Sequence, residues 1–420
     1  MNLSDYILHF LQKKKVYNVF TITGGAICFL MDSFSRNKKI SYTSVAHEQA
    51  AAMMADSYSR FGPNFSATMV TSGPGATNLL TGIACSWFDS IPAIHICGQV
   101  NRYELSNYHN STKKVRQVGF QETDIVSIAK PITKFAYQLK NENEIRYILE
   151  KAFYISQNGR PGPVLIDIPM DLQRKIIDHK KLRAYKPTKK KIKKEILFKK
   201  ITEVIYYLKK SKRPVVILGG GIRISKTIND LSFFLKKINI PIVTTWSGVD
   251  AITHDRNNYI GNIGVYGSRS ANFTIQNSDF VLSLGSRLDT RITGGVPKNF
   301  AREAIIASVD IDKNELNKNR GLKIKIKINV SLKEFFVAFK KKSLGLKITK
   351  PEWTQKTISW KKKYPIVVKE YRTQKKYVNP YFFMEKLSKH LREDDVIVAD
   401  DGAHLTWAIQ SLKVRKKQRL

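Results

Sequence analysis

The sequence is poor in cysteine, in acidic residues and in long apolar runs. Its three cysteines, Cys28, Cys85 and Cys97, are an odd number without metal-type spacing, which predicts reduced, mostly buried thiols and not disulfides. No apolar run reaches about 18 residues, so no membrane span is expected. The chain begins Met1-Asn2-Leu3-Ser4-Asp5, without a basic start and an apolar stretch, so no signal peptide is expected. These absences predict a cytoplasmic protein that does not act in a membrane.

The shortage of acidic residues leaves the chain strongly basic. Lys and Arg number 72 against 34 Asp and Glu, a net charge of +38, which would suit nucleic acid or another anionic surface. The lysines are scattered, however, and the dense runs at 189–194, 340–342 and 361–363 fall in candidate linkers. No basic helix with heptads, Cys/His finger or RNP-like aromatic strand is present. Nucleic acid is therefore not the expected partner.

Length and apolar content indicate a globular protein with several domains. Hydrophobic residues make up 42% of the chain and aromatic residues 10%, which is typical of folded proteins. A chain of 420 residues is too long for one ordinary core. Two or three domains are therefore expected.

The first block, residues 1–175, alternates apolar strands with helical patterns. Strands are predicted at 17–22, 66–71, 93–97 and 164–168. Near-continuous apolar strands between helices indicate a parallel sheet covered on both faces. Binding loops belong at the carboxyl ends of such strands. Gly24 and Gly25, Glu48, the Gly73–Gly75 loop and Gln99 fall there.

Two further blocks follow the first. Residues 176–198 are a lysine-rich linker in this interpretation, and 199–335 form a second α/β block with strands at 214–218, 280–284 and 304–309. A second linker at 336–376 precedes a third block, 377–420, with one helix and one strand at 395–400. The predicted fold class is α/β, with tandem doubly wound parallel-sheet domains and an incomplete third domain.

Glu48 is the residue of the sequence that says most about function. It stands where a strand pattern turns into an Ala- and Met-rich helix, in His47-Glu48-Gln49-Ala50-Ala51. A carboxylate is costly to bury there unless something binds it, and the glycine loops on either side would let a flat ligand approach the backbone. The plainer alternative is a helix-start carboxylate that the helix dipole favours.

Several motifs follow one another along the chain in a fixed order: Gly24-Gly25-Ala26, His47-Glu48-Gln49-Ala50-Ala51, Thr71-Ser72-Gly73-Pro74-Gly75-Ala76-Thr77-Asn78, Asp89-Ser90-Ile91-Pro92, Gly98-Gln99-Val100, Phe120-Gln121-Glu122 and Gly159-Arg160-Pro161-Gly162-Pro163-Val164. In this order they resemble the acetolactate synthase large subunits, within the thiamine-diphosphate-dependent decarboxylases and carboligases. Any one loop would be weak evidence, but the combined order is specific.

The resemblance implies a chemistry for the first block, residues 1–175, as the pyrimidine-binding domain. Glu48 matches the glutamate that hydrogen-bonds the aminopyrimidine ring of thiamine diphosphate and so promotes removal of the thiazolium proton. Gly24, Gly25 and Gln121 match positions around the cofactor and the 2-keto acid substrate. The alternative is ordinary turn glycines and a surface glutamine.

The resemblance implies that residues 199–335 form a Rossmann-like central domain, which binds FAD although the reaction does not use the redox chemistry of the flavin. The matching positions are Arg160, Gly219, Gly220, Gly221, Gly264, Tyr266, Gly267, Arg287, Asp289, Arg291 and Asp310. Arginines suit diphosphate oxygens, and glycines permit close backbone approach. A structural domain with solvated arginines is the alternative, because many members bind no FAD.

The chain departs from the family pattern in several places. The loop at 101–117 is longer, Met170 stands where a lysine is usual, and Gly402-Ala403-His404-Leu405 replaces a Gly-Gln-His-Gln run beside the cofactor diphosphate. Gly402 and His404 are nevertheless predicted to bind the cofactor. A neutral thioether cannot replace a cation, so a related activity, as in surface polysaccharide synthesis, stays open.

The family's Gly-Asp-Gly and Asn-Asn motif, which holds Mg²⁺ and the cofactor phosphates, has no match in the sequence. We therefore assign no metal ligand, expect 377–420 to be an incomplete diphosphate-binding domain, and expect activity to need a separate C-terminal fragment. The family builds its site between subunits, so a homo-oligomer is also expected. A split gene, a fragment and a non-catalytic remnant or assembly subunit remain alternatives.

Overall fold

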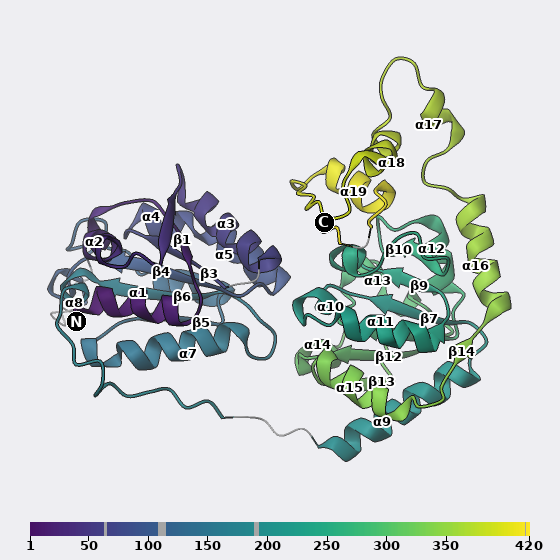
Figure 1. The fold of residues 1–420 in the computed structure, drawn as a ribbon, viewed down its shortest axis with the longest axis horizontal. Helices are drawn as coiled ribbons and strands as arrows, with labels where there is room; N and C mark the ends of the chain where they lie inside the picture. Colours follow the sequence, from purple (N-terminus) through teal and green to yellow (C-terminus); the bar gives the residue numbers. More distant parts are fainter. Residues whose placement is uncertain (63–64, 108–114, 189–192, 416) are drawn as a thin grey trace. The chain divides into compact units, whose positions relative to one another are not determined.

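The structure is a computed structural model that describes residues 1–420 except 63–64, 108–114, 189–192 and 416. It divides into two compact units, 1–190 and 191–420 (Figure 1). Each unit holds one six-stranded sheet, and every strand pair in both sheets is parallel. The predicted fold class, α/β with tandem doubly wound parallel sheets, is thereby confirmed. Parts of the predicted loop at 101–117 and of the lysine run at 189–194 lie outside the described residues.

The first sheet has the strand order β2-β1-β3-β4-β6-β5. Its strands are β1 Asn18–Thr21, β2 Ser41–Ser44, β3 Ser66–Val70, β4 Ala93–Gln99, β5 Phe135–Gln138 and β6 Val164–Pro169. The central strands β3, β4 and β6 are buried along their whole length, as continuous apolar runs covered on both faces require. The edge strands β2 and β5 are largely exposed or half-buried and more polar, so their sequences carry little strand signal.

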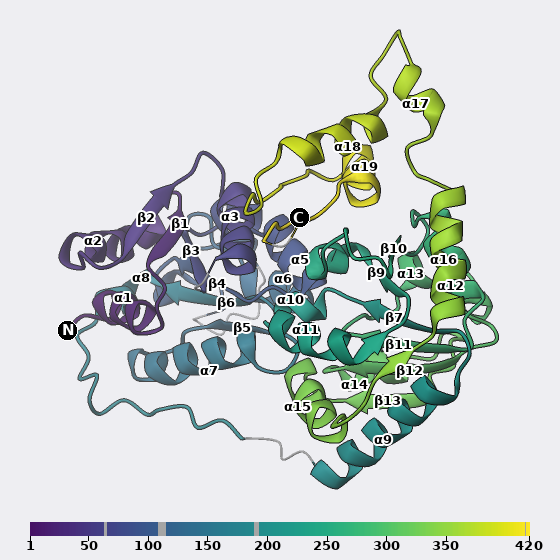
Figure 2. The ribbon, with the colours of Figure 1, turned by 45° about the vertical axis from the view of Figure 1, so that its right-hand side comes forward.

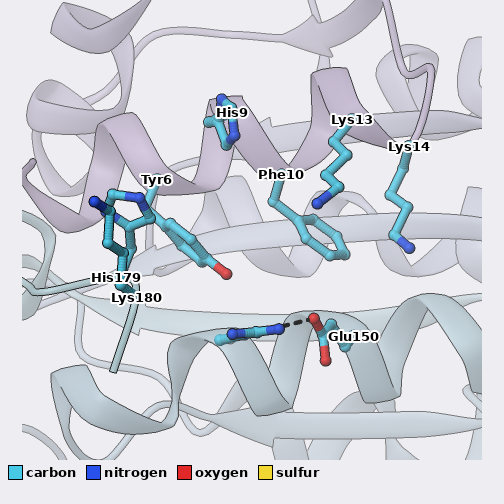
Figure 3. Close-up of a pocket in the computed structure, with 9 residues that line it drawn as sticks. Tyr6, His9, Phe10, Lys13, Lys14, Glu150, His179 and Lys180 are labelled. Carbon is cyan, nitrogen blue, oxygen red and sulfur yellow. Dashed lines mark hydrogen bonds and ion pairs between the residues drawn. The ribbon is translucent and has the colours of Figure 1, made fainter. Parts of the chain in front are cut away.

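Helices cover both faces of the first sheet. One face carries α1 Leu3–Lys13, α2 Cys28–Arg36, α7 Ile145–Gln157 and α8 Met170–Gln173, and the other carries α3 Glu48–Phe61, α4 Pro74–Asn78, α5 Leu80–Asp89 and α6 Ile125–Ala129. Short 3-10 turns join them at η1 Gly25–Ile27, η2 Arg102–Glu104, η3 Lys130–Ile132 and η4 Glu142–Glu144. Helices α1 and α7 run side by side (Figure 3).

The second sheet has the order β10-β9-β7-β11-β12-β13. Its strands are β7 Pro214–Leu218, β9 Ile242–Thr244, β10 Tyr259–Asn262, β11 Phe280–Leu284, β12 Ile305–Asp310 and β13 Ile326–Asn329, with the separate pair β8 Ile238–Asn239 and β14 Ile348–Thr349. Helices α9 Lys194–Lys210, α11 Ile228–Lys237 and α15 Leu332–Lys342 cover one face (Figure 2). The other face carries α12 Arg269–Gln276, α13 Thr290–Thr293 and α16 Pro351–Lys363.

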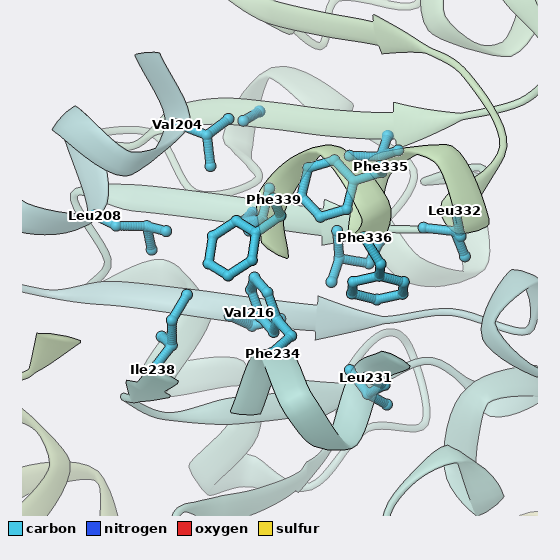
Figure 4. Close-up of a cluster of buried hydrophobic side chains, with 14 of the residues drawn as sticks. Val204, Leu208, Val216, Leu231, Phe234, Ile238, Leu332, Phe335, Phe336 and Phe339 are labelled. Carbon is cyan, nitrogen blue, oxygen red and sulfur yellow. The ribbon is translucent and has the colours of Figure 1, made fainter. Parts of the chain in front are cut away.

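A cluster of phenylalanines fills the space between α11, α15 and the second sheet. The Phe234 and Phe339 rings lie 4.8 Å apart between centroids, and Phe335 and Phe336 pack beside them (Figure 4). Offset and edge-on aromatic pairs of this kind add to the free energy gained from apolar burial. The remaining elements are α10 Gly221–Ile224, η5 Trp246–Ala251, η6 Pro297–Asn299, α14 Lys313–Asn317, α17 Lys369–Thr373, α18 Pro380–His390 and α19 Ala403–Ser411.

The C-terminal residues of the second unit, 403–415 and 417–420, contact the rest of that unit around one buried carboxylate, that of Asp250, and around His254. Asp250 pairs with Arg223 at 3.3 Å and with Arg419 at 2.7 Å. His254 Nδ1 lies 3.2 Å from the Leu412 carbonyl oxygen, and its backbone N–H donates to the Val414 carbonyl at 3.0 Å. Burial lowers the pKa of His254 to about 4, so the ring is a neutral partner.

Three predictions about these elements are wrong. The segment at 336–376 is not a bare linker, because α16 packs on the second sheet with Trp353 buried and its Nε1 donating to the Pro214 carbonyl at 3.2 Å. In the predicted first linker, Ile177 and Leu182 join the first core. The strand predicted at 395–400 is reduced to one bridge, Val396 with Arg419, because no strand lies beside it to pair with.

The cysteine prediction also needs correction. Cys97 lies buried in β4, but Cys28 and Cys85 are exposed on helices. All three thiols are free. Within the described residues, no helix is both long and apolar enough to cross a membrane.

Candidate active site

A first cluster of predicted residues lies at the carboxyl edge of the first sheet. Gly24 and Gly25 follow β1, Glu48 begins α3 just after β2, and Gly73 follows β3. Because all strands are parallel, their carboxyl ends meet at one edge. The structure therefore brings together the residues that the sequence singled out for the pyrimidine end of the cofactor.

Glu48 is held at the first turn of α3 with one oxygen uncommitted. Its side chain is buried, the whole residue being 9% exposed, and Asn78 Nδ2 donates to Oε2 at 2.9 Å. Among the described residues, no hydrogen-bond donor reaches Oε1. Oε1 faces the loop of Gly75, where a Cβ atom on that glycine would lie 3.3 Å from it, so this oxygen is available to a donor from a ligand.

The glycines beside Glu48 have two different roles. A Cβ atom on Gly24 would lie 2.5 Å from Thr71 Cβ, so Gly24 lets the loops after β1 and β3 touch. Thr71 Oγ1 then accepts a hydrogen bond from the Ala26 N–H at 3.1 Å. A Cβ atom on Gly25 would meet nothing within 4 Å. Gly25 therefore borders open space into which a ring could fit.

Gln121 joins the same cluster through a strained backbone. Its φ is +60° although it is not glycine, and a Cβ atom on Gly73 would lie 2.7 Å from Gln121 Cβ. Gly73 itself has φ +62°. Non-glycine residues in the left-handed region cost about 1 kcal/mol or more and concentrate at functional sites. The glycine at position 73 thus makes room for the loop that carries Gln121.

The sequence analysis did not predict a buried polar network that joins Gln99, Gln138 and Asp167. Gln99 Nε2 donates to the Thr123 carbonyl at 2.8 Å and to Asp167 Oδ2 at 3.1 Å, and Gln138 Nε2 donates to the same Oδ2 at 2.8 Å. Asp167 is fully buried, its Oδ1 has no partner among the described residues, and burial raises its pKa to about 7 against the two amide donors. The one signal in the sequence was a charged residue inside the apolar strand Val164-Leu165-Ile166-Asp167-Ile168.

Met170 begins α8 directly after β6. It therefore stands at the same carboxyl edge as Gln99 and the loop of Gln121. The departure from the family's lysine thus falls next to the cluster and not in a remote part of the unit.

A second cluster lies at the carboxyl edge of the second sheet. Gly219, Gly220 and Gly221 follow β7, Arg287 and Asp289 follow β11, and Asp310 ends β12. The strands are neighbours in the order β7-β11-β12. A Cβ atom on Gly219 would lie 2.2 Å from the Gly285 carbonyl oxygen, and one on Gly221 would lie 2.8 Å from Gly285 Cα. These two glycines are explained by loop-to-loop packing, which gives no argument for a flavin.

The turn after β10 reaches the same cluster. The Val265 N–H donates to the Arg291 carbonyl at 2.8 Å, and the Arg291 guanidinium carbon lies 5.7 Å from the Tyr266 ring centroid. Gly264 has φ +113°, and Gly267 packs against its backbone. Asp289 caps α13 by accepting from the Arg291 N–H at 3.0 Å and lies 3.4 Å from Arg287. Asp310 Oδ1 accepts from the Asp312 N–H at 2.8 Å.

Three predicted residues lie elsewhere. Arg160 is at the amino edge of the first sheet, just before β6, where its Nε donates to Ser90 Oγ at 2.7 Å; it is not beside Glu48. Gly402, with φ +150°, precedes α19, and His404 lies in the first turn of that helix. No group of three or more His, Cys, Asp or Glu residues that could hold a metal occurs in the described part of the chain.

Comparison with known proteins places these clusters in a family. Residues 1–128 match the thiamine pyrophosphate enzyme N-terminal TPP binding domain, and residues 201–338 match the thiamine pyrophosphate enzyme central domain. The chain therefore belongs to the thiamine-diphosphate-dependent enzymes, in the group that includes the acetolactate synthase large subunits.

Relatives along nearly the whole chain support this membership. The acetolactate synthase large subunit of Cyanidium caldarium is 34% identical over 98% of this chain and 69% of its own length. That of Buchnera aphidicola, from the host Acyrthosiphon pisum, is 32% identical over 99% of this chain and 71% of its own. Chloroplastic acetolactate synthase 1 of Nicotiana tabacum is 30% identical over 99% of this chain and 61% of its own.

Asp167 should make stability depend on pH. Because its folded-state pKa of about 7 exceeds the ordinary value near 3.8, the folded state keeps a proton that the unfolded state loses, and stability falls as pH rises from about 4 through 7. Asp167→Asn mimics the protonated form, so the variant should gain stability over the parent at pH 8, by up to about 4 kcal/mol, and much less at pH 5. Thermal unfolding midpoints at both pH values measure this, with exposed Asp394→Asn as the control. A difference that does not grow with pH would contradict the prediction.

Proposed function

We propose that the chain serves thiamine-diphosphate-dependent decarboxylation of a 2-keto acid followed by carboligation, of the acetolactate synthase type, in which two pyruvate molecules give acetolactate and CO2. The observation that carries the proposal is the uncommitted Oε1 of buried Glu48, facing glycine loops at the carboxyl edge of a parallel sheet. When bound, thiamine diphosphate supplies a thiazolium carbon that adds to the keto group and an electron sink for decarboxylation.

The residues of this chain would hold and polarise the cofactor's ring. Glu48 Oε1 would share a proton with the aminopyrimidine, while Asn78 keeps Oε2 fixed at 2.9 Å. Gly25 leaves room for the ring, since nothing lies within 4 Å of its Cβ position. Gln121, held over Gly73, would orient the carboxylate of the keto acid, because an amide N–H donates to carboxylate oxygens.

A related activity with a different 2-keto acid or acceptor is the second candidate. Met170 favours it, because a neutral thioether follows β6 at the edge where the family pattern has a cation. Turnover with pyruvate as the sole substrate, compared with turnover of other 2-keto acids, would separate the two candidates.

We further propose that Mg²⁺ accompanies the cofactor and that turnover needs a separate C-terminal part. Acetolactate formation by the chain alone would contradict that requirement.

Glu48→Gln should weaken binding of thiamine diphosphate at least about tenfold and, where turnover is measured, lower acetolactate formation by about 10²–10⁴. The amide keeps the shape of the side chain, so the thermal unfolding midpoint should barely change. Isothermal titration and an acetolactate assay measure the two effects, with Glu303→Gln, an exposed carboxylate of the second unit, as the matched control. Equal effects of the two variants would remove Glu48 from the proposed site.

We propose FAD as a ligand of the second cluster, supported by the arginines at one sheet edge and by Tyr266, whose ring lies 5.5 Å from that of Trp246. A guanidinium suits diphosphate oxygens. Arg291→Gln should therefore raise the dissociation constant for FAD about tenfold. Quenching of flavin fluorescence during a titration measures this constant. Exposed Arg302→Gln is the control. Absence of FAD binding to the parent chain would refute the assignment.

We also propose that the chain forms a homo-oligomer through the outer faces of α3 and α5. Met53 and Met54 on α3, and Trp87 and Phe88 on α5, are large exposed apolar side chains, which a second copy would bury. Phe88→Asp should shift the mass measured by analytical ultracentrifugation toward the monomer. Leu344→Asp, at an exposed position of the second unit, should not. A monomeric parent chain would contradict the proposal.

A further inference from the structure

A basic groove runs between α1 and α7 of the first unit, on the face of the sheet opposite to α3 and Glu48. Its volume is about 290 Å³, at the small end of the range for small-molecule sites. Side chains from three segments line it: α1, α7 and residues 179–180 (Figure 3). The proposed thiamine diphosphate site does not use any of them.

Positive charge dominates the lining. Lys13, Lys14, Arg146 and Lys180 face a single carboxylate, that of Glu150. Glu150 is already committed, because Oε1 pairs with Arg146 Nε at 3.1 Å and Oε2 accepts from the Tyr185 N–H at 2.7 Å. The groove thus offers an excess of cationic donors and few acceptors, which suits an anion.

Two of the cations are held in place. Arg146 Nη1 also donates to the Leu182 carbonyl at 3.1 Å, so its guanidinium, which lines the groove, is fixed by two partners. Lys14 Nζ lies 4.9 Å from the Phe153 ring centroid and 5.5 Å from that of Phe10, in cation–π geometry. Preorganised donors of this kind lose less entropy on binding than free surface lysines.

A hydroxyl group points into the groove without a protein partner. Tyr6 is 7% exposed, and within the described part of the chain its hydroxyl makes no hydrogen bond. Figure 3 shows it directed into the space between the two helices, toward α7. Burial raises the pKa of this phenol, so at neutral pH it stays a donor. The hydroxyl is therefore available to donate a hydrogen bond to a ligand oxygen in the groove.

We propose that the groove formed by Tyr6, Lys13, Lys14, Arg146 and Lys180 binds a small, multiply charged oxyanion. Phosphoryl and carboxylate groups share the required chemistry, since both present clustered acceptor oxygens to Lys and Arg. The small volume and the enclosed hydroxyl favour a compact ligand over an extended polyanion. The inference does not depend on the proposed thiamine diphosphate chemistry.

Isothermal titration of the full chain with inorganic pyrophosphate, at fixed salt, tests the proposal. Lys13→Gln combined with Lys180→Gln should raise the pyrophosphate Kd by about tenfold, because two exposed cations are lost from the site. Lys341→Gln combined with Lys362→Gln removes the same charge from exposed positions of the second unit and should leave Kd within about twofold.

Tyr6→Phe is the sharper variant, because it deletes one oxygen and no charge. It should raise Kd by about tenfold or more, the worth of one hydrogen bond to a charged group, and should not lower the thermal unfolding midpoint. Citrate binding with the same sensitivity to Tyr6→Phe would point to a carboxylate ligand within the same class.

Four results would overturn the proposal. One is no pyrophosphate binding by the parent chain. Another is an equal loss in the two lysine pairs, which would reduce the effect to general attraction by a basic protein. The third is a Tyr6→Phe variant that binds pyrophosphate as the parent does, which would remove the hydroxyl from the site. The fourth is binding of a duplex oligonucleotide with an affinity that grows with length and depends on the same lysines, which would exclude a compact site.

Discussion

The parallel alignment of the strands is the constraint on which the rest of the structure depends. In each unit, parallel pairing sends every strand's carboxyl end to the same edge. Loops that are 20 to 50 residues apart in the chain, those of Gly25, Glu48 and Gly73, are neighbours for this reason alone. The second sheet repeats the arrangement for Gly219, Arg287 and Asp310. The topology thus brings the loops of the site together, and the individual contacts then fix the side chains within it.

Much of the fold could be predicted because buried parallel strands have nearly continuous apolar sequences. The strands predicted at 66–71, 93–97, 164–168 and 214–218 correspond to β3, β4, β6 and β7, all buried on both faces. The edge strands β2 and β5 were not predicted, since half-exposed edges admit polar residues and carry no such pattern. The glycine loops at Gly24 and Gly73 were recognisable because they directly follow strand patterns, and Glu48 because it begins an Ala-rich helix. Gln121 lies in the loop before α6, well after β4, and only the family resemblance singled it out.

What the sequence could not reveal depends on packing between distant segments. Asp167 reads as one polar residue in an apolar strand, and only the structure shows Gln99 and Gln138 converging on it. Likewise, 336–376 looks like a linker because lysine is frequent, yet Trp353 covers the second sheet. One of its lysines, Lys361, also reaches the sheet, where its Nζ donates to the Tyr259 carbonyl at 2.7 Å. Arg160, which the family resemblance assigned to the FAD site, lies at the amino edge of the first sheet, just before β6; the direction of the strand decides this position, and the motif does not encode it.

The sharing of Asp250 by Arg223 and Arg419 has an evolutionary consequence. Two cations and one anion in a mostly buried position leave a surplus of positive charge, and burial, partly offset by Asp250, lowers the pKa of Arg223. Loss of the carboxylate would leave two arginines facing each other, whereas loss of one arginine would leave an ordinary pair. We therefore expect substitutions at these three positions to be coupled, so that loss of the aspartate is tolerated better after one of the arginines has changed.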